Sequence, residues 1–397
     1  MIINTLKTHK LSIFILSLII GIQIIGSLPR LNEPLIDGRL HWYFDNGLFL
    51  KLATHSNDDT QRSWKKAFGV TSYQYDAHNN VTGMSHYQNH PVLMPTLFKI
   101  YTQVVGSNDR APRSFALILS LISTVMVFAI FRLTVGNPAL SGGLTLLYCL
   151  LPLKWTYMDQ FKYENISELL IIASIFALIQ LREWKYGKQA FLIALFFLFQ
   201  TDWTAYMPGA IILGYLFLNR RSEEYQDILK PALITATTSF LVTLGIQYQL
   251  GFTPSAIYKT FLYRSGMDVQ NISWSVWAGK QWIFIKMNFG VGNTLLGISC
   301  FLISLVNKLW KKHDLSFFGI TLFIVSLVYI GVLRNQSFIH HYVQWTLMIS
   351  YLLLLGGLIR AYQKSDNTII NKSSIAIVMS IMILATWSDA SQTLLSF

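Results

Sequence analysis

The chain is poor in charged residues, which make up 13% of its 397 positions against about 25% in soluble globular proteins. Hydrophobic residues reach 53%, and the mean hydropathy is +0.43. This composition excludes an ordinary soluble domain and indicates a chain that lies in a bilayer. The net charge of +12 therefore predicts cytoplasmic loops held by lysine and arginine, and no nucleic-acid partner.

Cysteine and the short motifs of nucleotide chemistry are also scarce. The two cysteines, Cys149 and Cys300, fall inside apolar runs, which predicts buried free thiols that say little about the redox compartment. The sequence has no Walker loop, dinucleotide fingerprint, CxxC zinc pattern or nucleophile elbow. Chemistry on cytosolic nucleotide sugars is therefore not expected.

The chain is instead rich in long apolar runs. Because 189–218 carries Asp202 midway and basic clusters on both flanks, it is expected to be a hairpin of two spans, with 231–248 following as another. We predict an all-α polytopic protein with about 11 transmembrane helices. The other spans are expected at 11–29, 114–133, 138–153, 165–181, 289–306, 316–333, 341–359 and 373–388.

The distribution of basic residues predicts the topology. With a cytoplasmic amino terminus, most lysines and arginines of the short loops fall inside, and the short outer loops hold only Lys154, Lys162 and Arg334. We therefore expect a multi-pass protein of the cell (inner or plasma) membrane, with its active site on the extracytoplasmic face. The predicted segments are 1–29 (uncleaved signal anchor and first span), 30–113 (first outer loop), 114–248 (spans two to seven), 249–287 (outer loop) and 288–397 (spans eight to eleven).

The first outer loop, roughly eighty residues long, is where chemistry is expected, because long loops in compact proteins are usually functional. It holds Asp37 just past the first span, His90 within the string NHPVL, and Arg113 where the next span begins. Within it, 92–105 predicts an interfacial helix, and the polar stretch 54–80 predicts surface turns.

The run from Asn89 to Arg132, NHPVLMPTLFKIYTQVVGSNDRAPRSFALILSLISTVMVFAIFR, resembles membrane glycosyltransferases of the GT-C class. It is most similar to the family 39 group, which includes protein O-mannosyltransferases and aminoarabinose transferases acting on lipid A. That group shows a His-Pro-Pro-Leu-like motif, an apolar stretch, a Phe-Gly turn and an Arg-x-x-Ser in this order, and Gly106 and Arg113 take the last two places. The likeness covers about residues 30–220.

Further along the chain, the turn near Pro152, the hairpin at 190–218 and His341 also resemble this group. The chain departs from the pattern in the first loop and at the hairpin tip. Members of the group usually have Asp-Glu in the first loop, whereas Asp37 is followed by Gly38 here. At the hairpin tip they usually have Thr-Lys, whereas this chain has Thr201 followed by Asp202. These departures leave the class unchanged, and the sugar and the acceptor do not follow from the resemblance.

The resemblance implies a glycosyltransferase that takes a sugar from a polyprenyl-phosphate donor and passes it to a lipid, glycan or protein hydroxyl. Attack by that hydroxyl needs a general base, and the resemblance points to Asp37, whose carboxylate the neighbouring Arg39 would keep ionised. The alternative reading of Asp37 is an ordinary interfacial polar group.

Asp159 and Glu164 supply a second carboxylate, which would orient the acceptor or bind a divalent cation (Mg, Mn or Zn); otherwise they are solvated loop charges. His90 is a candidate metal ligand beside Asp159, or a donor to phosphate, against a plain turn histidine. The candidates for holding the donor phosphate are Arg113, Lys162, Arg264, Arg334, His340 and His341. Each of them has the alternative interpretation of an ordinary interfacial residue.

Two other functions compete with this interpretation. A transporter or flippase would place ionisable groups at mid-membrane and show repeated halves, whereas the predicted spans are nearly free of charge away from their ends. An O-antigen polymerase or ligase would share the lipid-linked substrates, but its large outer loop normally comes late in the chain. Here the long loop comes first.

Overall fold

The computed structural model describes residues 10–31, 71–75, 81–86, 93–106, 110–181, 183–249, 254–267 and 272–364, together with 383 and 386. The chain divides into two compact units. Unit 1 holds residues up to Ile24, Ser123–Tyr157 and Lys259 onward, and unit 2 holds Ile25–Ile122 and Met158–Tyr258.

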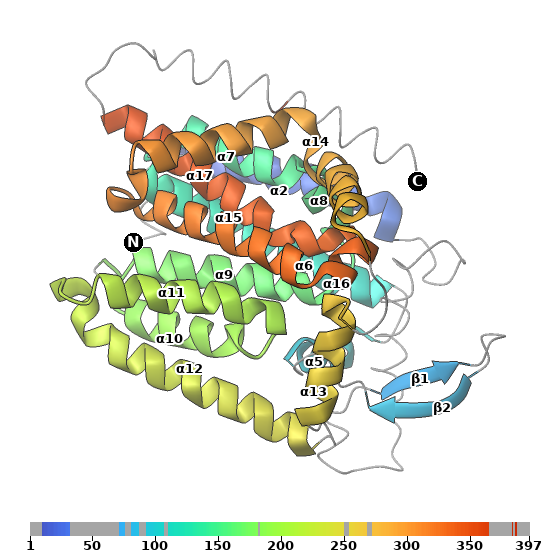
Figure 1. The fold of residues 1–397 in the computed structure, drawn as a ribbon. Helices are drawn as coiled ribbons and strands as arrows, with labels where there is room; N and C mark the ends of the chain where they lie inside the picture. Colours follow the sequence, from blue (N-terminus) through green and yellow to red (C-terminus); the bar gives the residue numbers. More distant parts are fainter. Residues whose placement is uncertain are drawn as a thin grey trace. The chain divides into compact units, whose positions relative to one another are not determined.

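The described residues are mostly helical, as the apolar runs predict. Their helices are α2 (Lys10–Leu31), α5 (Leu93–Val105), α6 (Arg110–Thr134), α7 (Pro138–Leu150), α8 (Pro152–Tyr157), α9 (Tyr163–Ile179), α10 (Gly187–Leu198), α11 (Tyr206–Leu218), α12 (Glu223–Gln249), α13 (Pro254–Ser265), α14 (Trp274–Val306), α15 (Asp314–Val332), α16 (Arg334–Ile339) and α17 (Trp345–Lys364), with 3-10 turns η1 (Trp203–Ala205), η2 (Leu309–Lys311) and η3 (His341–Gln344) (Figure 1).

Six helices in the described part of the chain are long and apolar enough to cross a bilayer, and shorter apolar helices cover 138–150, 187–198 and 203–218. The predicted span 373–388 lies almost wholly outside the described residues. The all-α polytopic fold class is confirmed, while the number of spans stays a prediction.

The hairpin expected at 189–218 is present as α10 and α11 in unit 2. The chain leaves the helix after Leu198, and Asp202 adopts an extended conformation immediately before η1. The extended backbone at Asp202 separates the two helices of the hairpin. The charged Asp202 in the middle of the apolar stretch had predicted this interruption. α9 and α12 both pack against the two helices of this hairpin (Figure 1).

Two segments differ from what the sequence predicted. Part of the stretch expected as surface turns forms strand β1 (Thr71–Tyr75), which pairs antiparallel with β2 (Val81–His86). β1 reads TSYQY, and its β-branched and aromatic residues favour a strand over a turn. The segment 249–287, expected as a loop, contains α13 and the start of α14.

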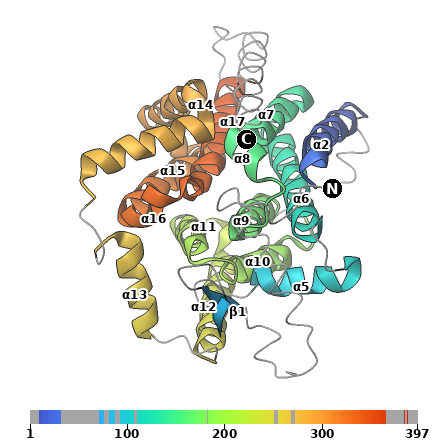
Figure 2. The same cartoon turned by 90° about the vertical axis from the view of Figure 1, so that its right-hand side faces the viewer.

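In unit 1, α14, α15 and α17 pack together (Figure 2). Helix α14 is broken at Gly290, whose φ of 75° and ψ of 161° are outside the helical region. Only glycine adopts this conformation without strain, so Gly290 fixes the position of the break.

His313, which caps α15 and lies outside the spanning helices, gives unit 1 a pH-dependent stability. Burial lowers the pKa of its imidazole below 6.5, and Arg360, Lys364 and Lys312 lower it further, while Asp314 acts in the opposite direction. Between the lowered pKa and 6.5 the unfolded chain binds more protons, so the free energy of unfolding falls as pH drops through this window. We expect thermal unfolding in detergent to show this loss, and His313→Gln to remove it; an unchanged pH profile in the variant would contradict the assignment.

Candidate functional site

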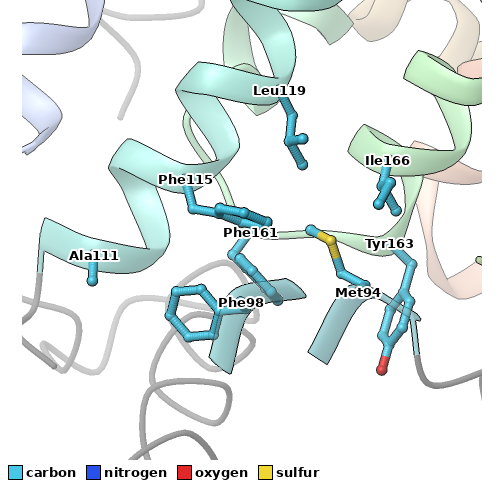
Figure 3. Close-up of a cluster of buried hydrophobic side chains, with 8 residues drawn as sticks. All are labelled: Met94, Phe98, Ala111, Phe115, Leu119, Phe161, Tyr163 and Ile166. Carbon is cyan, nitrogen blue, oxygen red and sulfur yellow. The ribbon is translucent and has the colours of Figure 1, made fainter. Parts of the chain in front are cut away.

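A cluster of buried side chains holds together the elements of unit 2 on which most candidate site residues lie. Figure 3 shows Phe98 of α5, Phe115 of α6 and Phe161, which precedes α9, packed against one another. The ring centroids of Phe98 and Phe161 are 4.6 Å apart, and Phe115 lies 5.7 Å from each. The full cluster consists of Met94, Phe98, Ala111, Phe115, Leu119, Phe161, Tyr163 and Ile166.

Two candidate cations are interleaved with this cluster in the sequence. Arg113 lies between Ala111 and Phe115 in the first turns of α6, and Lys162 lies between Phe161 and Tyr163 at the start of α9. Both are buried, with 2% and 6% of their surface exposed. A cation at a helix amino terminus opposes the helix dipole, so neither is placed there for helix stability. Buried cations at helix starts are suited to an anionic ligand.

Asp159 is fully buried and forms an ion pair with Arg30, the basic residue in the last turn of α2. The distance from Arg30 Nε to Asp159 Oδ2 is 2.9 Å. The reading of Asp159 as a solvated loop charge is therefore wrong. Ion pairs of this kind fix a geometry, because each charge is costly to bury without the other.

The tip between α10 and α11 lies against the same elements. The backbone N–H of Leu93, the first residue of α5, donates to the carbonyl of Gln200 at 3.4 Å, and the hydroxyl of Ser167 in α9 donates to that of Thr201 at 2.9 Å. Asp202 is buried and accepts a hydrogen bond of 2.5 Å from the Thr204 hydroxyl. The tip thus adds a buried carboxylate to this end of unit 2.

The two glutamates of α9 differ in their surroundings. Glu164 is half-buried in the first turn of α9 and is therefore not a loop charge; a carboxylate there stabilises the helix amino terminus, and its predicted catalytic role stays a prediction. Glu168, one turn later, is buried at 5% exposure. The acids and bases together make this end of unit 2 rich in buried ionisable groups, which in membrane proteins usually mark functional sites.

The other candidates that the structure describes belong to unit 1. Arg264 is half-buried in the last turn of α13, Arg334 begins α16, and His340 and His341 follow α16. The guanidinium of Arg334 lies 5.0 Å from the centre of the Trp274 ring. This cation–π interaction is favourable in itself, so it accounts for part of the position of the Arg334 side chain.

Asp37 and His90 lie outside the described residues, so their predicted roles stay predictions. Among the residues that are described, no three histidines, cysteines or acids group as metal ligands. Asp159, the other metal candidate, has the Arg30 guanidinium against its Oδ2 atom, an environment that disfavours a cation there.

Two further cations, Arg30 and Lys154, were not singled out as site residues from the sequence. Arg30 is partly buried and follows the first predicted span, where an arginine at the outer end of a span opposes the usual distribution of charge and could have drawn attention to it. Lys154 of α8 in unit 1 is 3% exposed, with its ammonium 4.8 Å from the centre of the Tyr148 ring. Because Lys154 lies between two apolar runs, the sequence predicted only a charged residue in a short outer loop.

Comparison with protein families confirms the resemblance read from the sequence. Residues 89–249 match the family model described as dolichyl-phosphate-mannose-protein mannosyltransferase. The match includes the NHPVL string, α5, α6, α9 and the α10–α11 hairpin. No curated protein matches the sequence.

Solved structures show the same fold. ArnT from Cupriavidus metallidurans, crystallised with undecaprenyl phosphate, matches with a TM-score of 0.60 and 12% identity over 95% of this chain and 74% of ArnT. The apo oligosaccharyltransferase of Archaeoglobus fulgidus matches with a TM-score of 0.55 and 10% identity over 96% of this chain and 56% of that protein. The chain thus spans little more than half of the oligosaccharyltransferase. The predicted GT-C fold is confirmed.

Proposed function

We propose that the chain is a membrane glycosyltransferase that transfers a sugar from a polyprenyl-phosphate donor to a hydroxyl of a lipid, glycan or protein at the outer membrane face. The observation that carries the proposal is the set of ionisable groups at one end of unit 2, above all the buried Asp159, Arg113 and Lys162 and the partly buried Arg30, in a GT-C fold. The undecaprenyl phosphate bound to ArnT supports a polyprenyl-phosphate donor.

The proposed reaction is a displacement at the anomeric carbon of the donor sugar. The acceptor oxygen forms the new glycosidic bond, its proton passes to the Asp37 carboxylate, and the bond to the phosphate oxygen breaks with its electron pair. The phosphate that leaves gains negative charge as the bond breaks. Fixed cations that face it therefore stabilise the transition state more than the ground state.

The described residues suit the phosphate side of this reaction. Arg113 and Lys162 are buried at helix amino termini, where backbone N–H groups also favour an anion. Asp159 holds the Arg30 guanidinium at one position, so that this cation needs little reorganisation during the reaction. Asp159 is thus proposed as a positioning carboxylate, and Arg30 as a third contact for the donor phosphate.

The proposal predicts that Asp37→Asn abolishes most of the transfer activity. Loss of a general base typically costs a factor of 10² to 10⁴, so we expect a fall of at least about a hundredfold. Transfer is measured in membranes from a radiolabelled polyprenyl-phosphate hexose, with wild type and variant at equal expression.

Asp58→Asn is the matched control, since it removes a carboxylate from the polar stretch of the same loop. It is expected to transfer at the wild-type rate. Equal activity of the Asp37 variant and wild type would remove Asp37 from the mechanism. Failure of wild type to transfer any lipid-linked sugar would favour the transporter instead.

A further inference from the structure

One face of α14 in unit 1 is occupied by polar side chains that hydrogen-bond to a single neighbouring segment. Trp277, Gln281 and Asn288 follow one another at intervals of four and seven residues, which places them on the same side of a helix. All three donate to residues 333–344, the segment that joins α15 to α17. We refer to this segment as the linker.

The bonds form a continuous ladder. The Trp277 indole donates to the Ser337 hydroxyl at 2.9 Å, and the Gln281 amide donates to the Ser337 carbonyl at 2.7 Å. Gln344 closes the ladder, because its amide donates to Gln281 Oε1 at 3.1 Å and its own oxygen accepts from the Asn288 amide at 3.0 Å. Gln344 is 1% exposed, Asn288 2% and Gln281 6%.

The linker also forms a hydrogen bond to α13. The linker consists of the short helix α16, the extended residue His340 and the 3-10 turn η3, so its backbone forms few hydrogen bonds of its own. Asn335 donates to the carbonyl of Tyr263 in α13 at 2.9 Å. The shape of the linker is therefore set from outside, chiefly by the amides of α14.

Buried amides are well suited to define one arrangement. An amide that loses its partner in apolar surroundings keeps the full cost of its desolvation, so alternative registers of the linker against α14 are disfavoured. Leucine side chains at these positions could pack α14 against the linker equally well, but they would not favour one register of the linker over another. Arg334, His340 and His341, which are candidates for holding the donor phosphate, are carried on this linker.

We infer that Gln281, Asn288 and Gln344 are positioning residues that hold the linker, and with it the phosphate candidates Arg334 and His340, in one conformation. This inference rests on the proposed function and adds to it a device within unit 1. The three amides act on the donor only through the linker.

The test compares Gln344→Leu with Asn293→Leu. Asn293 is a second buried amide of α14, but it bonds to Thr386 at 2.9 Å and to Tyr351 at 3.1 Å, away from the linker. Both variants are expected to lower the melting temperature by about 5 °C, since each leaves buried polar partners behind. Only Gln344→Leu is expected to weaken binding of undecaprenyl phosphate in nanodiscs, by about tenfold.

A variant in which Gln281, Asn288 and Gln344 are all replaced by leucine separates positioning from stability. The triple variant removes all three amides that bond to one another and leaves only the Ser337 carbonyl without its Gln281 donor, so its melting temperature should return to within about 3 °C of wild type. Binding should stay about tenfold weaker. Hydrogen exchange of the amides of residues 333–344 should be faster than in wild type.

Equal binding and equal exchange of the linker in wild type and Gln344→Leu would overturn the inference. So would the same loss of binding in Asn293→Leu, because a general loss of stability would then explain both. If wild type binds no undecaprenyl phosphate, the proposed function fails. The exchange rates of the linker still decide whether the amides position it.

Discussion

Arg30→Met is expected to lower the free energy of unfolding by about 3 to 5 kcal/mol, because it removes the cation that lies 2.9 Å from a fully buried carboxylate. The substitution keeps much of the side-chain volume, so the loss reports the charge rather than a cavity. Thermal or denaturant unfolding in detergent measures it.

Two comparisons make this prediction specific. Lys188→Met removes a cation from the exposed pair of Lys188 and Asp227, whose atoms are 3.9 Å apart and whose side chains are 50% and 76% exposed. Solvent and salt screen such a pair, so the expected cost is under about 1 kcal/mol. The double variant Arg30→Met/Asp159→Leu should regain most of the stability, because it removes both buried charges. A cost for Arg30→Met as small as that for Lys188→Met would contradict the buried pair.

Gly319→Ala is expected to cost roughly 3 kcal/mol, at the upper end for overpacking a core. A Cβ at Gly319 in α15 would lie 2.8 Å from the backbone nitrogen and from the Cγ atom of Leu354 in α17. A backbone atom cannot move aside without shifting the whole helix, so α15 and α17 would have to separate.

Gly331→Ala on the same helix is the control, since a Cβ there meets no atom within 4 Å. Alanine favours a helix by about 1 kcal/mol over glycine, so this variant should be at least as stable as wild type. Equal stability of the two variants would mean that α15 and α17 are not packed as closely as the structure has them.

The helices could be predicted because a spanning segment must be long, apolar and internally hydrogen-bonded, and each of these demands is written in the local sequence. Asp202 even predicted the hairpin tip, since a charge is poorly tolerated within a span. The β-hairpin was missed because the alternation in TSYQY is short and lies in a polar region. The helical start of α14 was missed because its tryptophans and lysines resemble a loop at the interface.

The candidate site was predicted residue by residue but not as an arrangement. Asp159 was predicted to be a second carboxylate of the site, yet its burial and its pairing with Arg30 depend on a contact between distant parts of the chain. No local pattern encodes such a contact. The amides of α14 were not considered for the same reason, since Gln344 finds Gln281 only when α14 packs beside the linker.

Sugar transfer from a polyprenyl-phosphate hexose by the double variant Arg30→Met/Asp159→Leu decides whether this ion pair acts in the reaction. This variant is expected to fold, so a change in transfer reports chemistry rather than stability. We expect a loss of at least about a hundredfold, because a preorganised cation at the leaving phosphate would be missing. Transfer at the wild-type rate by the folded variant would contradict it.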